Sequence, residues 1–135
     1  MEVRLADCAG FCFGVKRAVD TVYEQLKNGK TIYTYGPIVH NEEVVRELSE
    51  KGVRVLENKE ELKHLKAGEN IPTVIIRAHG VAKEIYDIME ANGLECIDAT
   101  CPFVKKIHRI VEQKSTEGYH VIVVGDPKHP EVEGI

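Results

Sequence analysis

The chain has 135 residues, of which 43% are hydrophobic and 30% are charged, a composition typical of a soluble globular protein. This length predicts one domain or slightly more, large enough to bury a core without disulfides. The net charge of −4 argues against a nucleic-acid-binding surface, which would be basic. No stretch approaches the roughly 20 apolar residues of a membrane span, and the N-terminus lacks the pattern of a signal peptide. We therefore expect a cytoplasmic protein that binds neither nucleic acid nor membranes.

Short apolar runs typical of strands alternate along the chain with amphipathic segments typical of helices. We predict strands at residues 3–7, 31–35, 53–56, 73–77, 94–98 and 119–124. We predict helices at residues 15–26, 41–52, 58–66, 83–92 and 102–118, with the start of another at residues 130–135. Strands separated by helices indicate βαβ units, so we predict an α/β fold with a mostly parallel sheet flanked by helices.

The cysteines fall into two groups by their place in this pattern. Cys8 and Cys96 lie within or at the end of predicted strands, so we interpret them as small core residues. Cys12 and Cys101 instead come just before predicted helices. Thiols stay reduced in the cytoplasm, and thiolates at helix N-termini have lowered pKa values that suit metal or cluster binding.

Five reactive side chains share one position, just beyond a predicted strand and near the start of a helix. They are Cys12, His40, His79, Cys101 and His129. Because the carboxyl ends of parallel strands lie on one edge of a sheet, we expect these side chains to face one crevice. Helix N-termini attract anions, and imidazoles add charge or hydrogen-bond donors. The pattern therefore predicts a site for a phosphate or diphosphate.

The residues alone leave three hypotheses open for this site. The chain could be an enzyme, with Glu131 beside His129 as a candidate proton donor; it could be a non-catalytic phosphate-binding α/β domain; or Cys12, Cys101 and a histidine could bind zinc. Neither a P-loop nor a dinucleotide-binding fingerprint is present. The remaining histidines lie on helix or strand bodies, where we expect structural or solvated side chains: His64, His108 and His120.

Five ordered motifs resemble a known family. They are residues 10–15 (GFCFGV), 39–41 (VHN), 78–81 (AHGV), 98–102 (DATCP) and 129–134 (HPEVEG). In this order they resemble the LytB-type 4-hydroxy-3-methylbut-2-enyl diphosphate reductases, iron–sulfur enzymes of the methylerythritol phosphate route to isoprenoids. The resemblance implies three similar α/β units around a central site, of which residues 1–100 form the first and residues 101–135 begin the second.

The resemblance also implies roles for the site residues. Cys12 and Cys101 would be two of the three cysteines that hold a 4Fe–4S cluster. His40, His79 and His129 would bind the diphosphate of the allylic substrate, and Glu131 would pass protons to the leaving hydroxyl. Electrons would come from a ferredoxin or flavodoxin, and the products would be isopentenyl and dimethylallyl diphosphate.

The family's third cluster cysteine has no counterpart among these residues. It lies further along the family's chain than residue 135, and neither Cys8 nor Cys96 is at the matching position. We therefore expect this chain to be an N-terminal fragment. Alone, we expect it to hold no complete cluster and to show no reductase activity.

Overall fold

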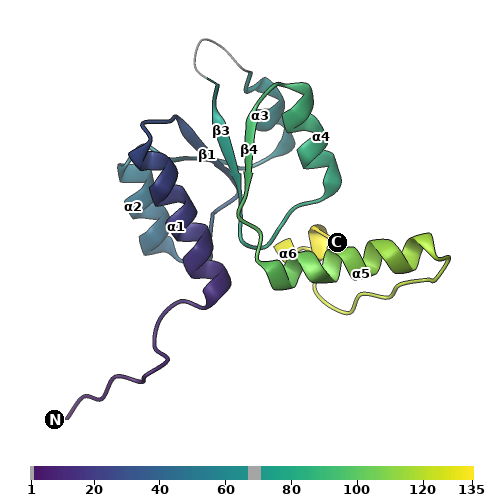
Figure 1. Ribbon diagram of the computed structural model, residues 1–135, viewed down its shortest axis with the longest axis horizontal. Helices are drawn as coiled ribbons and strands as arrows, with labels where there is room; N and C mark the ends of the chain where they lie inside the picture. Colours follow the sequence, from purple (N-terminus) through teal and green to yellow (C-terminus); the bar gives the residue numbers. More distant parts are fainter. Residues whose placement is uncertain (1, 67–70) are drawn as a thin grey trace.

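A four-stranded parallel sheet forms the centre of the molecule in a computed structural model, which describes residues 2–66 and 71–135 (Figure 1). The strands are β1 (Ile32–Tyr35), β2 (Arg54–Leu56), β3 (Thr73–Ile76) and β4 (Glu95–Asp98). They lie in the order β2-β1-β3-β4, and each neighbouring pair is parallel. The predicted α/β class with a parallel sheet is confirmed.

Helices cover both faces of this sheet. In chain order, the described helices are α1 (Phe13–Lys27), α2 (Glu42–Glu50), α3 (Lys59–His64), α4 (Lys83–Ala91), α5 (Pro102–Thr116) and α6 (Pro130–Glu133). The helices α1 and α2 pack on one face, whereas α3 and α4 pack on the other (Figure 1). Within the described part of the chain, no helix is both long and apolar enough to cross a membrane.

The central strand β3 shows why these residues form a sheet covered on both sides. All four of its residues are buried. Ile75 belongs to the core beneath α1 and α2, whereas Val74 and Ile76 belong to the core beneath α3 and α4. Successive side chains of a strand point to opposite faces, so a strand buried on both faces is a continuous apolar run.

Asparagine side chains begin two of the helices. Asn41 accepts a hydrogen bond from the Val44 N–H, and Asn58 accepts one from the Glu61 N–H. Each cap satisfies a backbone donor that the first turn of a helix leaves without a partner. The predicted N-cap at Asn41 is confirmed, and it fixes where the chain turns after His40.

Two predicted strands do not form. Residues 3–7 are an extended tail that points away from the body, and residues 119–124 lead back from α5 toward α6 without regular structure (Figure 1). Leu5 is 86% exposed and Val124 is 95% exposed. A strand needs a neighbour for its backbone hydrogen bonds, and no described residue pairs with either segment. A strand-like apolar sequence is therefore insufficient by itself to make a strand.

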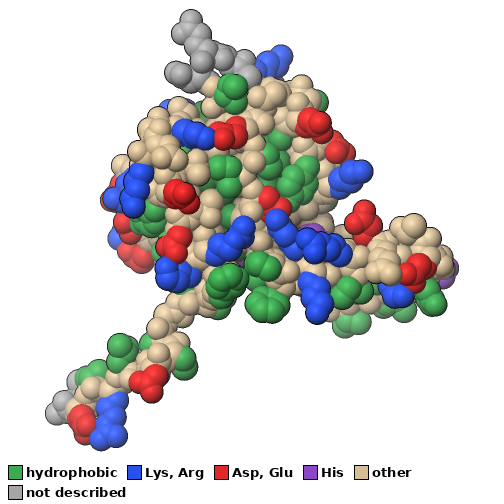
Figure 2. Space-filling model, viewed as in Figure 1, with side chains coloured by type: hydrophobic (Ala, Val, Ile, Leu, Met, Phe, Trp, Pro, Cys, Tyr) green, Lys and Arg blue, Asp and Glu red, His purple; other side chains and the backbone are tan. Residues whose placement is uncertain are grey.

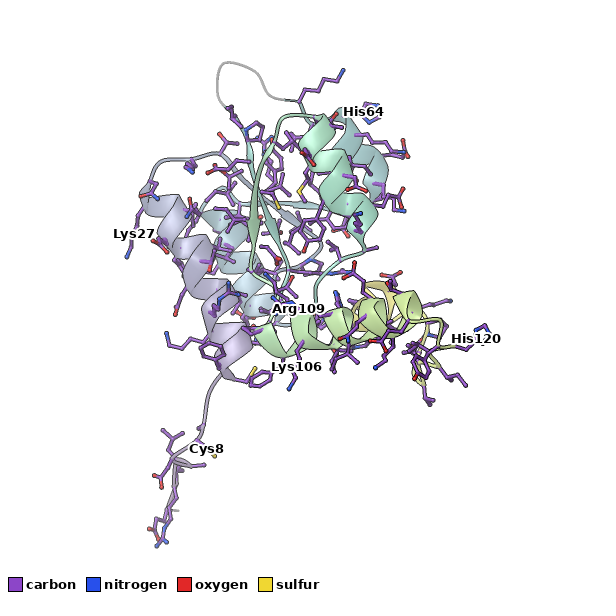
Figure 3. The ribbon with its side chains drawn as sticks, turned by 45° about the vertical axis from the view of Figure 1, so that its right-hand side comes forward. Cys8, Lys27, His64, Lys106, Arg109 and His120 are labelled. Atoms are coloured by element: carbon purple, nitrogen blue, oxygen red, sulfur yellow. The ribbon has the colours of Figure 1, made fainter. Side chains whose placement is uncertain are left out.

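The two cysteines expected in the core are also exposed. Cys8 lies on the extended tail, away from the sheet (Figure 3). Cys96 lies on β4, which among the described strands has a neighbour on one side only. Partial burial of its thiol, together with the Asp98 carboxylate, raises the pKa of Cys96 to about 11. It therefore stays protonated at neutral pH.

Candidate functional site

The loops that follow the strands stay in register beyond the sheet. The Ala78 N–H donates to the Ile38 carbonyl at 3.2 Å, and the Cys101 N–H donates to the Ala78 carbonyl at 2.9 Å. Parallel pairing therefore continues past the ends of β1, β3 and β4. This places the residues that follow, His40 and His79 among them, at one edge of the sheet, as predicted.

Three imidazoles gather at this edge. The ring centroids of His40 and His79 are 4.3 Å apart, and the His129 centroid is 6.3 Å from each. His40 and His79 follow strands, whereas His129 is the N-cap of α6 and follows the irregular segment after α5. The expectation that His129 follows a strand is therefore wrong, yet the structure brings its ring into the group.

His79 is the most deeply placed of the three rings. Its pKa is lowered to about 4, first by burial and then by the charges of His40, Arg77 and His129. The ring is therefore neutral at pH 7. Its Nδ1 is buried without a hydrogen-bond partner among the described residues. Buried polar atoms are nearly always paired, so this nitrogen is suited to meet a polar ligand.

His129 and Glu131 are coupled by a local hydrogen bond. The backbone N–H of Glu131 donates to Nδ1 of His129 at 3.3 Å. A neutral imidazole that accepts at Nδ1 carries its proton on Nε2, so Nε2 is left as the donor. The Glu131 side chain is exposed, one residue into α6. The start of α6 thus places the imidazole N–H of His129 and the carboxyl group of Glu131 two residues apart in the sequence.

Both candidate thiol ligands are N-cap residues. Cys12 precedes α1 and Cys101 precedes α5, and neither side chain makes a capping hydrogen bond. The first turn of α1 touches Cys101, because a Cβ on Gly14 would lie only 2.6 Å from the Cys101 Sγ. Glycine is therefore required for this approach. Cys12 follows the irregular tail rather than a strand, so that part of the expectation is wrong.

Arg17 holds the two thiol-bearing segments together. From the second turn of α1 it donates to the carbonyl of Thr100 at 3.1 Å and to that of Asp98 at 3.3 Å. These hydrogen bonds cross from α1 to the end of β4, directly before Cys101. Thiolates are the usual ligands of iron–sulfur clusters, so the donor chemistry of Cys12 and Cys101 fits such a group. Across the described residues, no three His, Cys, Asp or Glu side chains converge to hold a metal ion.

Positive charge lies near the thiols. Lys and Arg side chains gather where the lower end of α1 meets α5 (Figure 2). Lys106 and Arg109 project from α5 in this region (Figure 3), and neither forms an ion pair among the described residues. The overall charge of the chain is −4, so the basic character is local. A local positive potential favours anionic ligands or acidic partners.

Sequence reasoning missed three residues that organise the site: Arg17, Arg77 and His108. Arg17 could have been found, because it lies beside Ala18 on the buried side of an amphipathic helix. Arg77 directly follows the fully buried β3, where a cation needs a specific partner. His108 carried no comparable sign, and its role depends on contacts with glycines far away in the sequence.

Comparison with known proteins gives consistent matches. A family model described as LytB protein matches residues 3–135. A 4-hydroxy-3-methylbut-2-enyl diphosphate reductase of Caldanaerobacter subterraneus subsp. tengcongensis is 51% identical over 137 aligned positions, which cover 100% of this chain and 46% of the relative. The corresponding reductase of Alkaliphilus oremlandii is 46% identical and is covered to 47%.

Solved structures agree with these relatives. A structure of (E)-4-hydroxy-3-methyl-but-2-enyl diphosphate reductase, the terminal enzyme of the non-mevalonate pathway, superposes with a TM-score of 0.79 at 46% identity, over 96% of this chain and 44% of that one. The Plasmodium falciparum E-1-hydroxy-2-methyl-but-2-enyl-4-diphosphate reductase superposes with a TM-score of 0.84 at 37% identity, over 95% of this chain and 39% of that one. The chain spans about half the length of the curated relatives it matches.

Proposed function

This chain belongs to the LytB protein family, and from that premise we propose that it carries the diphosphate-binding histidines and two cluster cysteines of a 4-hydroxy-3-methylbut-2-enyl diphosphate reductase. The observation that carries the proposal is the group of three imidazoles at the carboxyl edge of the sheet. The names of the relatives and the donor chemistry of the thiols support it. Residues 1–100 would be the first α/β unit of that enzyme, and residues 101–135 the start of the second.

In this proposal the three histidines bind the diphosphate of the allylic substrate. His129 offers its Nε2–H as a donor. The unpaired Nδ1 of His79 gains a partner if this nitrogen is protonated and donates to the diphosphate. The charges of a diphosphate also favour protonation of a ring whose pKa is low mainly because it is buried. We therefore expect binding at pH 7 to take up protons from solution.

Glu131 is the proposed proton donor to the substrate. It lies in the α6 turn, two residues from His129, so a diphosphate bound to His129 brings the substrate close to its carboxyl group. In the overall reaction the carbon–oxygen bond of the allylic alcohol breaks, two electrons enter the allyl group, and the hydroxyl leaves as water after taking up a proton. A second proton, added to the allyl carbon, gives isopentenyl or dimethylallyl diphosphate.

Cys12 and Cys101 are proposed to hold a 4Fe–4S cluster together with a third ligand. When bound, such a cluster supplies the electrons for this reduction. Because Cys12 and Cys101 are two of the three proposed ligands, we expect anaerobic reconstitution with iron and sulfide to yield less than one cluster per chain. A brown protein with a full cluster spectrum at one cluster per chain would contradict this expectation.

A ferredoxin or flavodoxin is the proposed electron donor. Lys106 and Arg109 give the surface beside the thiols a positive charge, which would complement an acidic carrier. The reaction uses a water-soluble diphosphate and soluble carriers, so we place the protein in the cytoplasm.

Binding of inorganic pyrophosphate tests the diphosphate site directly. We expect isothermal titration calorimetry at pH 7 to detect binding, with proton uptake revealed by comparing two buffers of different ionisation enthalpy. His79→Asn should weaken binding at least about tenfold, since one charge-assisted hydrogen bond is worth about 1.5–3 kcal/mol. The control is His64→Asn, because His64 lies at the exposed end of α3 far from the site (Figure 3). Equal affinity of the two variants would overturn the proposal.

A further inference from the structure

The α6 turn carries His129 and Glu131, and it is held against the first part of the chain by contacts that no motif indicated. We propose that Arg77 and His108 are positioning residues, which dock α6 against the end of β3 and so set where His129 and Glu131 lie. This inference rests on the function proposed above, because it concerns the same diphosphate site.

Arg77 makes the first contact. Its Nη2 lies 3.6 Å from Oε2 of Glu133, the last residue of α6. The Arg77 side chain is only 14% exposed, whereas that of Glu133 is 58% exposed. Arg77 also donates from Nε to the Gly80 carbonyl at 3.4 Å. Arg77 is therefore fixed by contacts near β3, and its ion pair with Glu133 draws the end of α6 toward β3.

A glycine makes room for the arginine. Gly36, directly after β1, has a φ of +69°, and a Cβ there would lie 2.6 Å from Nη1 of Arg77. Any other residue at this position would strain the backbone and displace the guanidinium. The arginine also lines a cavity of about 260 Å³ together with Lys59 and Glu133. Lys59 is already paired with Glu84, which leaves Arg77 as the cation for Glu133.

His108 makes the second contact. Its ring, on α5, lies between Gly80 and Gly134. A Cβ on Gly80 would lie 2.9 Å from Cε1 of His108, and a Cβ on Gly134 would lie 3.1 Å from the same atom. Gly134 is the C-cap of α6, so the imidazole fills the gap between the end of α6 and the loop that carries His79.

These contacts matter because α6 cannot hold its own position. It has four residues, far fewer than the roughly 12 that an isolated helix needs to be even marginally stable, and the segment before it has no regular structure. The 6.3 Å separations of His129 from His40 and His79 therefore depend on how α6 is docked. If docking is lost, His129 leaves the group and the site loses one of its donors.

Glu133→Gln tests the ion pair. The side chain is exposed, so we expect an unchanged thermal midpoint. We expect amide hydrogen exchange at residues 131–134 to become about fivefold faster and pyrophosphate to bind about fivefold more weakly, as for a partly buried ion pair. The control is Glu60→Gln, which removes an exposed ion pair with Lys63 on α3 and should change neither quantity.

Gly134→Ala tests the histidine contact by a different route. Gly134 has a φ of −75°, so alanine is free of backbone strain there, but its Cβ would press on the His108 ring. We expect the same faster exchange and weaker binding as for Glu133→Gln. In a His108→Ala background the obstacle is gone, so adding Gly134→Ala should change neither exchange nor affinity further.

The two readouts separate this inference from the proposed function. If the unaltered chain does not bind pyrophosphate, the proposed function fails, and amide exchange alone decides whether α6 is docked as described. If it binds, but Glu133→Gln and Gly134→Ala leave both exchange and affinity unchanged, the docking proposal is wrong. Equal effects of Gly134→Ala with and without His108 would show that the ring does not set the position of α6.

Discussion

The central strand β3 and residues 119–124 contain similar apolar, β-branched sequences, but they have different structures. β3 is buried along its whole length, whereas Ile122 is 85% exposed and Val124 is 95% exposed. β3 has β1 and β4 as neighbours, and helices cover both of its faces. The other segment has no strand beside it within the described residues. A strand-like sequence therefore requires neighbours to pair with before it becomes a strand.

The sharpest test of this comparison truncates an isoleucine in each region. Ile75→Ala removes a fully buried side chain from β3, so we expect it to lower the free energy of unfolding by about 2–5 kcal/mol. Ile122→Ala shortens an exposed side chain and should change it by less than about 0.5 kcal/mol. Urea unfolding followed by circular dichroism measures both. Equal losses would mean that residues 119–124 pack as tightly as β3.

The same difference explains how much of the fold could be predicted from the sequence. The predicted strand at residues 73–77 agrees with β3 to within one residue, because apolar periodicity and flanking turns are local features. Residues 3–7 have the same kind of pattern and form no strand. Pairing depends on residues distant in the sequence, and a local pattern contains no information about them.

The candidate site shows the same limit. His40, His79 and Cys101 could be located from strands that do form. Cys12 and His129 were chosen because of strands that do not form, yet both occupy N-caps of helices. Their predicted positions at the starts of helices are therefore confirmed, although the strands expected before them are absent from the described residues. The contacts of Arg77 and His108 could not be predicted, because they join segments separated by more than twenty residues and depend on glycines that make room for them.

Gly14→Ala tests how tightly the chain packs at the start of α1, where the exposed tail meets the buried body. The tail ends at Cys12, but Gly14 is buried and its Cβ would overlap the Cys101 Sγ. We expect a loss of about 1–3 kcal/mol in the free energy of unfolding, as for overpacking of a core. The double variant Gly14→Ala/Cys101→Ala removes the sulfur but keeps the Cβ of residue 101, 3.0 Å away, so it should recover part of the lost free energy. No recovery would mean that Gly14 is required for a reason other than Cys101.

The pH dependence of the free energy of unfolding tests how deeply the His79 ring is buried. The pKa of His79 is about 4 in the folded chain, below the 6.5 of an unperturbed histidine, mainly because the ring is buried. Because its pKa is lowered on folding, His79 binds a proton more readily in the unfolded chain. Its contribution to the free energy of unfolding is therefore complete above pH 6.5 and is lost as the pH falls toward 4. We expect a loss of about 1 kcal/mol by pH 5.5, measured by urea unfolding. His79→Asn should remove this part of the slope, and an unchanged slope would show that the ring is solvated.

The smallest effect is expected in the tail, where Leu5 is the exposed counterpart of the buried Leu62. Leu5 is 86% exposed and Leu62 is fully buried beneath α3. Leu5→Ser should change the free energy of unfolding by less than about 0.5 kcal/mol, because no apolar contact is lost. Leu62→Ala should cost about 2–5 kcal/mol, because it leaves a cavity between α3 and the sheet. A loss above 1 kcal/mol for Leu5→Ser would mean that the tail packs on the body in solution. Residues 3–7 would then owe their strand-like sequence to contacts within this chain.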